Sequence, residues 1–387
     1  LEFSRVLFRS RDDLSALEGY HSPQVTVRVR LNTNESPFPP PESWRRAFSD
    51  ELAAVEWHRY PDRSASALRE GIARLHGVRP DQVFVANGSN EVLQTVLLTF
   101  AGPGRTVATF EPTYQLHGHI ARLTGATVVE CERAADFTLD LAEVHRVLGA
   151  HSPTVTFLCS PNNPTGAVAS RDNLEAWVAW ARRHDAVLIF DAAYDAFIQD
   201  PALPRSIYEI PAARTCAIEM RSFSKRAGFT GLRCAYTVVP KELSGTTASG
   251  ERVPLRDLWA RRVSTKFNGV PYPVQRAAAA VFSPAGRKQT AEQVAYYMEN
   301  ARRLREGLGA AGFVLFGGEH APYIWMRTPA GLSSWTCFDH LLEEAGVVGT
   351  PGAGFGPAGE GYLRLSAFNS RENVEQAIER IRRAFGG

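Results

Sequence analysis

Short runs of β-branched and aromatic residues alternate along the chain with longer stretches in which apolar residues recur every three or four positions. The short runs lie at residues 83–85, 106–110, 154–158, 186–190, 216–220 and 234–239. Between them, residues 91–100 and 172–183 have the periodicity of amphipathic helices. Buried strands that alternate with such helices predict an α/β fold built on a mostly parallel sheet.

The remaining segments predict how the chain divides into domains. Residues 240–253 have a loop-like composition, the Gly/Pro-rich stretch NGVPYP at 268–273 is typical of an exit from a domain, and residues 275–308 predict a long helical region. A short α+β tail follows and ends in a helix over 370–385. At ~150 residues per domain, 387 residues predict a large domain over 46–272 and a smaller one over 273–387, joined by an N-terminal arm over 11–45. The first ten residues, LEFSRVLFRS, are unlike the rest and are interpreted as a cloning scar or translated adapter.

Composition narrows the class of protein. Apolar residues make up 44% and charged residues 22%, which excludes wholesale disorder. A formal net charge of +2 gives no electrostatic signature of nucleic-acid or anionic-membrane binding. No apolar run approaches the ~20 residues of a membrane helix. Five cysteines without a CxxC pair argue against a disulfide framework or a zinc cluster. We therefore expect no bound metal, and we expect the protein to lie in the reducing cytoplasm.

Lys225 is the first candidate for chemistry, because it follows directly on the strand predicted at 216–220 in the sequence Ser222-Phe223-Ser224-Lys225. A lysine held partly out of water at such a place suits a Schiff-base role, and the two hydroxyls suit a phosphate. A surface loop lysine is an equally good interpretation of this motif alone.

Two further strand ends carry polar side chains. Asp191 ends the strand at 186–190, with Tyr194 three residues on, and Asn163 opens the turn Asn-Pro-Thr-Gly. Asp191 alone could simply cap a helix. Paired with Lys225, it could hold a pyridinium nitrogen protonated, while the Asn163 amide could reach a ring oxygen.

A phosphate site is predicted where Ser89 and Asn90 open a helix after Asn87-Gly88. Free N–H groups and the helix dipole suit an anion there, although a plain N-cap would have the same sequence. Arg233, eight residues after Lys225, could pair with that phosphate. Each motif alone is weak, and their order along the chain strengthens all of them.

With these motifs in place, the chain resembles the pyridoxal-phosphate aminotransferases of fold type I, class I/II, from Arg11 to its C-terminus. The resemblance implies a homodimer with a large α/β cofactor domain and a smaller α+β domain, in which Lys225 bonds the cofactor, Asp191 pairs with its ring nitrogen, and Tyr194 with Asn163 meets its phenolic oxygen. It further implies that the phosphate is bound by Ser89, Asn90, Ser222, Ser224 and Arg233. Tyr114 of EPTY would stack on the cofactor ring, and Tyr60 of HRYPD would contact the phosphate from the second subunit. Arg364 of YLRLSAF would hold the substrate carboxylate, with Asn163, Asn268 and Tyr20 also reaching the substrate.

The two ends of the chain resemble different subfamilies. LEGYHSP, LNTNESP, HRYPD and NGSNEVLQ, before about residue 160, are similar to histidinol-phosphate aminotransferase, an enzyme of histidine biosynthesis. FDAAYDAFI, RSFSKRAGFTGLRC, STKFNGV, APYIW and GTPGAGFGPAGEGYLRLSAF are similar to LL-diaminopimelate aminotransferase, an enzyme of lysine biosynthesis. The longer second match favours LL-diaminopimelate as donor and 2-oxoglutarate as acceptor. The alternatives are histidinol phosphate as donor, a β-lyase or decarboxylase on the same fold, and a catalytically dead pyridoxal-phosphate-binding chimera of the two halves.

Overall fold

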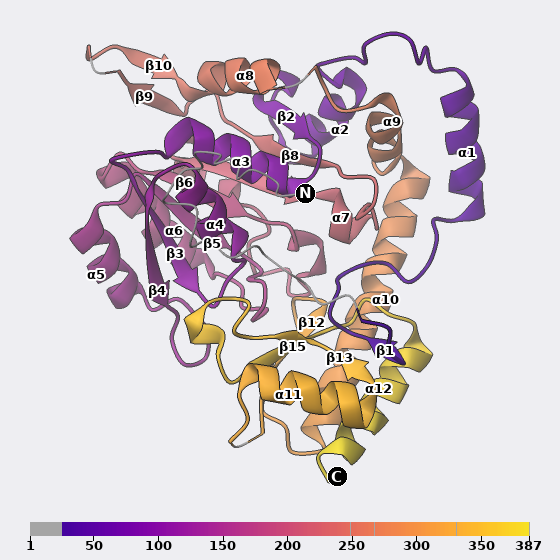
Figure 1. The fold of residues 1–387 in the computed structure, drawn as a ribbon. Coiled ribbons are helices and arrows are strands. Elements are labelled where there is room, and N and C mark those ends of the chain that lie inside the picture. Colours follow the sequence, from indigo (N-terminus) through magenta and orange to yellow (C-terminus); the bar gives the residue numbers. More distant parts are fainter. Residues whose placement is uncertain (1–24, 248, 267, 330, 387) are drawn as a thin grey trace, which may run out of the picture.

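A computed structural model describes residues 25–247, 249–266, 268–329 and 331–386 (Figure 1). Its centre is a seven-stranded sheet in the order β2-β8-β7-β6-β5-β3-β4. The strands are β2 (Val83–Ala86), β3 (Thr106–Glu111), β4 (Thr127–Glu132), β5 (Val155–Cys159), β6 (Val187–Asp191), β7 (Ala217–Ser222) and β8 (Ala235–Val238). Only β8 runs antiparallel to its neighbours, β2 and β7. The prediction of an α/β fold with a mostly parallel sheet is confirmed.

Helices cover both faces of this sheet (Figure 1). They are α2 (Ser66–His76), α3 (Ser89–Phe100), α4 (Leu116–Leu123), α5 (Leu141–His151), α6 (Arg171–Arg183), α8 (Leu255–Lys266) and α9 (Tyr272–Ala280), while α1 (Glu42–Ala53) has no buried residue. Successive strand residues point to opposite faces, so Leu188 and Phe190 join the cluster under α6, and Ile189 joins the cluster under α3 and α4. Both faces are therefore apolar, as expected of a parallel sheet.

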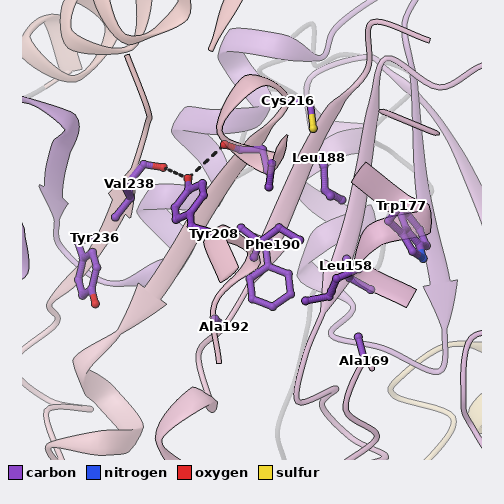
Figure 2. Packing of buried hydrophobic residues seen from close by; sticks show 14 of the residues in the cluster. Leu158, Ala169, Trp177, Leu188, Phe190, Ala192, Tyr208, Cys216, Tyr236 and Val238 are labelled. Carbon is purple, nitrogen blue, oxygen red and sulfur yellow. Dashed lines mark hydrogen bonds between the residues drawn. The ribbon is translucent and has the colours of Figure 1, made fainter. Parts of the chain in front are cut away.

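The cluster on the α6 face is drawn in Figure 2, where Trp177 of α6 lies over Leu158 and Leu188. Tyr208, from the short helix η4 (Ile207–Glu209), brings a polar group into it. Its hydroxyl lies 2.8 Å from the carbonyl oxygen of Val238 and 3.2 Å from that of Ala217, so the buried oxygen is hydrogen-bonded (Figure 2).

A second, antiparallel sheet has the strand order β11-β12-β15-β14, and its strands β12 and β15 are labelled in Figure 1. Its strands are β11 (Leu315–Gly317), β12 (Tyr323–Arg327), β15 (Tyr362–Ser366) and β14 (Thr350–Pro351). The helices α10 (Pro284–Gly309) and α11 (Ser334–His340) pack on these strands, and α12 (Arg371–Ala384) shares their apolar cluster. Near the start of the described chain, β1 (Val29–Arg30) pairs in parallel with β13 (Val347–Val348). The first described residues and the C-terminal part of the chain therefore lie together beside this sheet, while the domain boundaries drawn from the sequence stay a prediction.

Two sequence predictions were wrong. Residues 240–253 are not all loop, because β9 (Ser244–Thr246) and β10 (Arg252–Pro254) form an antiparallel hairpin. The helical region predicted over 275–308 is two helices, α9 and α10, separated at residues 281–283. Pro284 cannot donate a backbone hydrogen bond, and the Ser283 hydroxyl accepts from the Gly286 N–H, so the chain starts a new helix there.

No helix in the described ranges is both long enough and apolar enough to cross a membrane. The chain's first ten residues lie outside those ranges.

Candidate active site

A cavity of about 250 Å³ opens where β5, β6 and β7 end. Parallel strands bring their carboxyl ends to one edge of a sheet, which is where ligands bind in such folds. The predicted residues that line this cavity are Ser89, Asn90, Tyr114, Asn163, Asp191, Tyr194, Ser222, Ser224, Lys225, Arg233 and Arg364. Residues far apart in the sequence are thus brought to one place.

Lys225 lies in α7 (Phe223–Arg226), a single turn that starts when the Ser222 hydroxyl accepts a hydrogen bond from the Ser224 N–H. Its Nζ donates to the backbone oxygen of Asn34 over 2.8 Å. Burial lowers the pKa of Lys225 to about 8, and the positive charges of Arg364 and Arg233 act in the same direction. The amine is thus far closer to its neutral, nucleophilic form at physiological pH than an exposed lysine.

Asp191, at the end of β6, is buried and bonded on two sides. One carboxylate oxygen accepts from the Ala193 N–H over 3.1 Å, and the other lies 2.9 Å from His117 Nε2. Because a carboxylate only accepts, the imidazole donates from Nε2. The His117 ring also stacks on Phe157 with centroids 4.4 Å apart. The stacking holds the imidazole in place, and the imidazole in turn holds the Asp191 carboxylate in its orientation.

His117 was missed from the sequence. It is one of two histidines on α4, and the contact that gives it a role is with Asp191, 74 positions away in the sequence. Its nearness to Tyr114 in the sequence EPTYQLH is the only local signal, and the Tyr114 and His117 rings do meet edge to face, 5.6 Å apart.

Tyr194 and Asn163 also line the cavity, and each is hydrogen-bonded to a neighbouring side chain. The Tyr194 hydroxyl accepts from Asn34 Nδ2 over 2.6 Å, and burial raises its pKa above the ordinary value, so it stays protonated. Asn163 Oδ1 accepts from Arg364 Nη1 over 2.8 Å. Asn34, which contacts both Tyr194 and Lys225, therefore ties the N-terminal arm to the site.

The predicted phosphate end is built on the start of α3, which begins at Ser89 rather than at Glu91 as the sequence suggested. Within the described chain no side chain caps this helix, so N–H groups of its first turn remain available to an anion. A Cβ placed on Gly88 would lie 2.5 Å from Arg233 Nη2, and its φ of +94° favours glycine. The missing side chain lets the Arg233 guanidinium approach the helix end.

Arg364 of β15 is buried and held by several acceptors. Besides Asn163, its guanidinium donates to the backbone oxygen of Asn32 over 2.8 Å and to Thr350 Oγ1 over 3.2 Å. The Phe355 ring centroid lies 5.0 Å from Arg364 Cζ. The Nε atom has no partner among the described residues, and a guanidinium fixed in this way suits a carboxylate.

Tyr60 and Asn268 do not line the cavity of their own chain. Tyr60 is 78% exposed, and Asn268 is exposed as well. Their two segments lie together, because the Gln275 amide donates both to the backbone oxygen of Asp62 over 2.8 Å and to that of Val270 over 2.6 Å. Tyr20 lies outside the described residues.

A family model described as aminotransferase class I and II matches residues 26–381. The chain belongs to the class I and II aminotransferases. It is a pyridoxal-phosphate-dependent aminotransferase with the fold-type-I architecture of that family.

Solved structures of aminotransferases are similar over nearly the whole chain. LL-diaminopimelate aminotransferase from Chlamydomonas reinhardtii is 36% identical, with a TM-score of 0.84 and coverage of 94% of this chain and 92% of that one. An aromatic aminotransferase from Pyrococcus horikoshii is 26% identical, with a TM-score of 0.84 and coverage of 96% and 97%. A variant of Thermus thermophilus aspartate aminotransferase is 26% identical, with a TM-score of 0.83 and coverage of 97% and 100%.

The residues of this aminotransferase fit pyridoxal phosphate chemically. The cradle left open at Gly88 beside Arg233 and the uncapped start of α3 suit its phosphate. The oriented carboxylate of Asp191 suits a protonated ring nitrogen, and Lys225 offers an amine with a lowered pKa. The residues that line this one cavity thus include suitable partners for the phosphate, the ring nitrogen and the aldehyde carbon of the cofactor.

Proposed function

We propose that this aminotransferase takes its amino group from LL-diaminopimelate, or from a donor of the same kind, and passes it to a 2-oxo acid such as 2-oxoglutarate. The buried Arg364 guanidinium, held beside Lys225 in one cavity, is the observation that carries the proposal. Such a guanidinium suits the α-carboxylate that both donor and acceptor possess. The 36% identity to an LL-diaminopimelate aminotransferase, against 26% to the aromatic and aspartate enzymes, supports this donor.

The rim of the cavity adds a group that suits the far end of this donor. Glu35 lines the cavity, is exposed, and acts to raise the pKa of Lys225 against the larger effect of burial. A carboxylate there would attract the distal ammonium of a substrate with two amino-acid ends. An aspartate or aromatic donor would leave that carboxylate without an opposite charge.

The roles of the other residues follow from their positions. Bound pyridoxal phosphate supplies a ring that withdraws electrons from the carbon that loses its proton. We assign the phosphate to Ser89, Asn90, Ser222, Ser224 and Arg233, and the ring to Asp191, Tyr194, Asn163 and Tyr114. The Lys225 amine, once freed, would accept the proton from the substrate's α-carbon and deliver it to the C4′ carbon of the cofactor. His117 keeps the Asp191 carboxylate in its orientation.

Histidinol phosphate stays the second candidate donor. Asn32 and Asn34, from the segment similar to histidinol-phosphate aminotransferase, line the cavity. Histidinol phosphate has no carboxylate, so Arg364 would have to meet its phosphate. Whether the chain joins two subfamilies in one gene stays a hypothesis.

We also propose a homodimer with shared sites. Tyr60 and Asn268 are exposed, they lie in two segments that pack together, and they do not line the cavity of their own chain. A two-fold interface would bring this surface of each subunit to the other's cavity.

A half-reaction screen tests the donor. Purified holoenzyme is mixed with LL-diaminopimelate, histidinol phosphate, glutamate or phenylalanine, and conversion of the cofactor to its amine form is followed by absorbance. We expect kcat/KM to be highest for LL-diaminopimelate, and Glu35→Gln to lower it for that donor but not for glutamate. A tenfold preference for histidinol phosphate would overturn the proposal, and the absence of any half-reaction would favour the dead-chimera hypothesis.

A further inference from the structure

A second and larger cavity, of about 590 Å³, lies outside the site described above. Its walls come from the end of α2, from α7 and α10, and from the segments between β6 and β7. Arginines dominate its charged lining: Arg205, Arg214, Arg221, Arg226 and Arg287 face Asp195 and Glu209. Five positive against two negative groups leave an excess of positive charge, which Glu219 beneath the wall reduces but does not remove.

Two of these arginines are already used by the fold. Arg221 is buried, and its guanidinium donates to Asp195 over 2.5 Å and to Glu219 over 2.6 Å. Arg205 donates to the backbone oxygens of Asp195 and Ile198 over 3.4 Å and 2.6 Å. Both therefore hold the wall together and are not the groups that a ligand would meet first.

The other three have no acidic partner among the residues that the structure describes. Arg214 lies over the Tyr208 ring, with its Cζ 5.3 Å from the centroid, while Arg226 and Arg287 make no side-chain contact with a carboxylate in the described chain. Guanidinium groups that share a wall repel one another unless an anion lies between them. They come from three separate elements, so no single helix explains their convergence.

Two further observations agree with the excess of positive charge in this cavity. Arg287 lies near the start of α10, whose first turn has no acidic residue, although the helix dipole disfavours a cation there. His76, on the cavity wall, is buried, and its pKa falls to about 3 through burial and the nearby charges of Arg221, Arg214 and Arg226. The imidazole is therefore neutral and adds no positive charge to that of the arginines.

We propose that this cavity binds a phosphate-bearing small molecule through Arg214, Arg226 and Arg287. A carboxylate is planar and is satisfied by one guanidinium fork, whereas a phosphate presents oxygens in several directions and suits donors from three elements. The volume exceeds what a single phosphate group fills, so the ligand carries a further group. The lining of this cavity and that of the active site include sequence neighbours, because Arg226 follows Lys225 and Asp195 follows Tyr194.

Calorimetric titration of the holoenzyme with inorganic pyrophosphate, at constant ionic strength, tests the proposal. We expect saturable binding of one pyrophosphate per chain, with Kd raised at least tenfold in Arg214→Gln and in Arg287→Gln. The matched control is Arg183→Gln, which removes the same charge from the exposed end of α6 and should leave Kd unchanged. Arg287 is exposed, so its variant remains informative if Arg214→Gln fails to fold.

Three results would overturn the proposal. Equal weakening in Arg183→Gln would show that pyrophosphate responds only to net charge. A change in the absorption band of the bound cofactor on titration would place pyrophosphate in the active site instead. Citrate binding as tightly as pyrophosphate would refute the phosphate class, since we expect citrate to bind at least tenfold more weakly.

Discussion

The His117 imidazole joins two parts of the large sheet, because Nε2 donates to Asp191 at the end of β6 while the ring lies parallel to Phe157 of β5. The interplanar angle is 9°, so stacking fixes the plane in which the N–H points. A hydrogen bond to a buried carboxylate contributes about 1–3 kcal/mol when its loss leaves the acceptor unsatisfied. The hydrogen bond from His117 therefore fixes the orientation of the Asp191 carboxylate.

His117→Phe should lower kcat/KM at least tenfold, which corresponds to about 1.4 kcal/mol. Phenylalanine can keep the stacking on Phe157 but cannot donate to Asp191. His119→Phe, on the same helix α4, is the control and should have near-normal activity. A purely structural role for His117 would instead lower the melting temperature and leave kcat/KM of the folded enzyme unchanged.

Lys225→Ala should abolish turnover and still leave pyridoxal phosphate bound, because the groups assigned to the phosphate and ring do not include the lysine. Equilibrium dialysis measures the bound cofactor, and a coupled assay measures transamination. The exposed Lys241 provides a matched Lys241→Ala control, which should keep full activity. Near-normal transamination by Lys225→Ala would contradict the catalytic assignment.

Covalent attachment of pyridoxal phosphate to the apoprotein should depend on pH with a break near pH 8. Attack requires the neutral amine, and burial lowers the pKa of Lys225 to about 8 from its ordinary value of 10.5. The rate constant should rise about tenfold per pH unit below the break and level off above it. The positive charge of Arg364 lowers the pKa of Lys225. Its removal in Arg364→Met favours the protonated amine, so the break in the rate should move to higher pH.

Gly356→Ala should destabilise the enzyme and raise KM for the 2-oxo acid. Gly356 has a φ of +107°, and an added Cβ would overlap the Glu111 carboxylate. Such crowding costs about 1–3 kcal/mol and would displace Phe355, which packs on Arg364. Gly361→Ala is the control, because its φ of +79° imposes similar backbone strain while an added Cβ meets nothing within 4 Å. Equal losses of unfolding free energy in both variants would show that strain alone matters.

Mixing two inactive variants should restore activity if sites are shared between subunits. One partner is Lys225→Ala, and the other is the double variant Tyr60→Phe, Asn268→Ala. Half of the exchanged dimers would be mixed, and each would have one complete site, so about a quarter of wild-type activity is expected. No recovery after proven subunit exchange would refute the shared-site proposal.

The sequence predicted those features that local pattern determines. The strand ends that carry Asp191 and Lys225 lie within two residues of their predicted places, because buried β-branched runs stop where the chain turns. The β9–β10 hairpin was missed because Ser244, Gly245 and Thr246 have too little apolar alternation to indicate a strand. The second cavity was also missed, since the convergence of Arg214, Arg226 and Arg287 is a tertiary arrangement without sequence spacing.

The pairing of β1 with β13 bears on how the enzyme is made in the cell. A nascent chain that has emerged as far as Val238 contains every strand of the seven-stranded sheet, and it contains Lys225. It still lacks Arg364, and the strand that aligns the arm with Asn32 and Asn34 has not been synthesised. Folding during translation can therefore complete the central sheet well before the substrate-binding half exists, and catalytic competence arises only after β15, which carries Arg364, has left the ribosome.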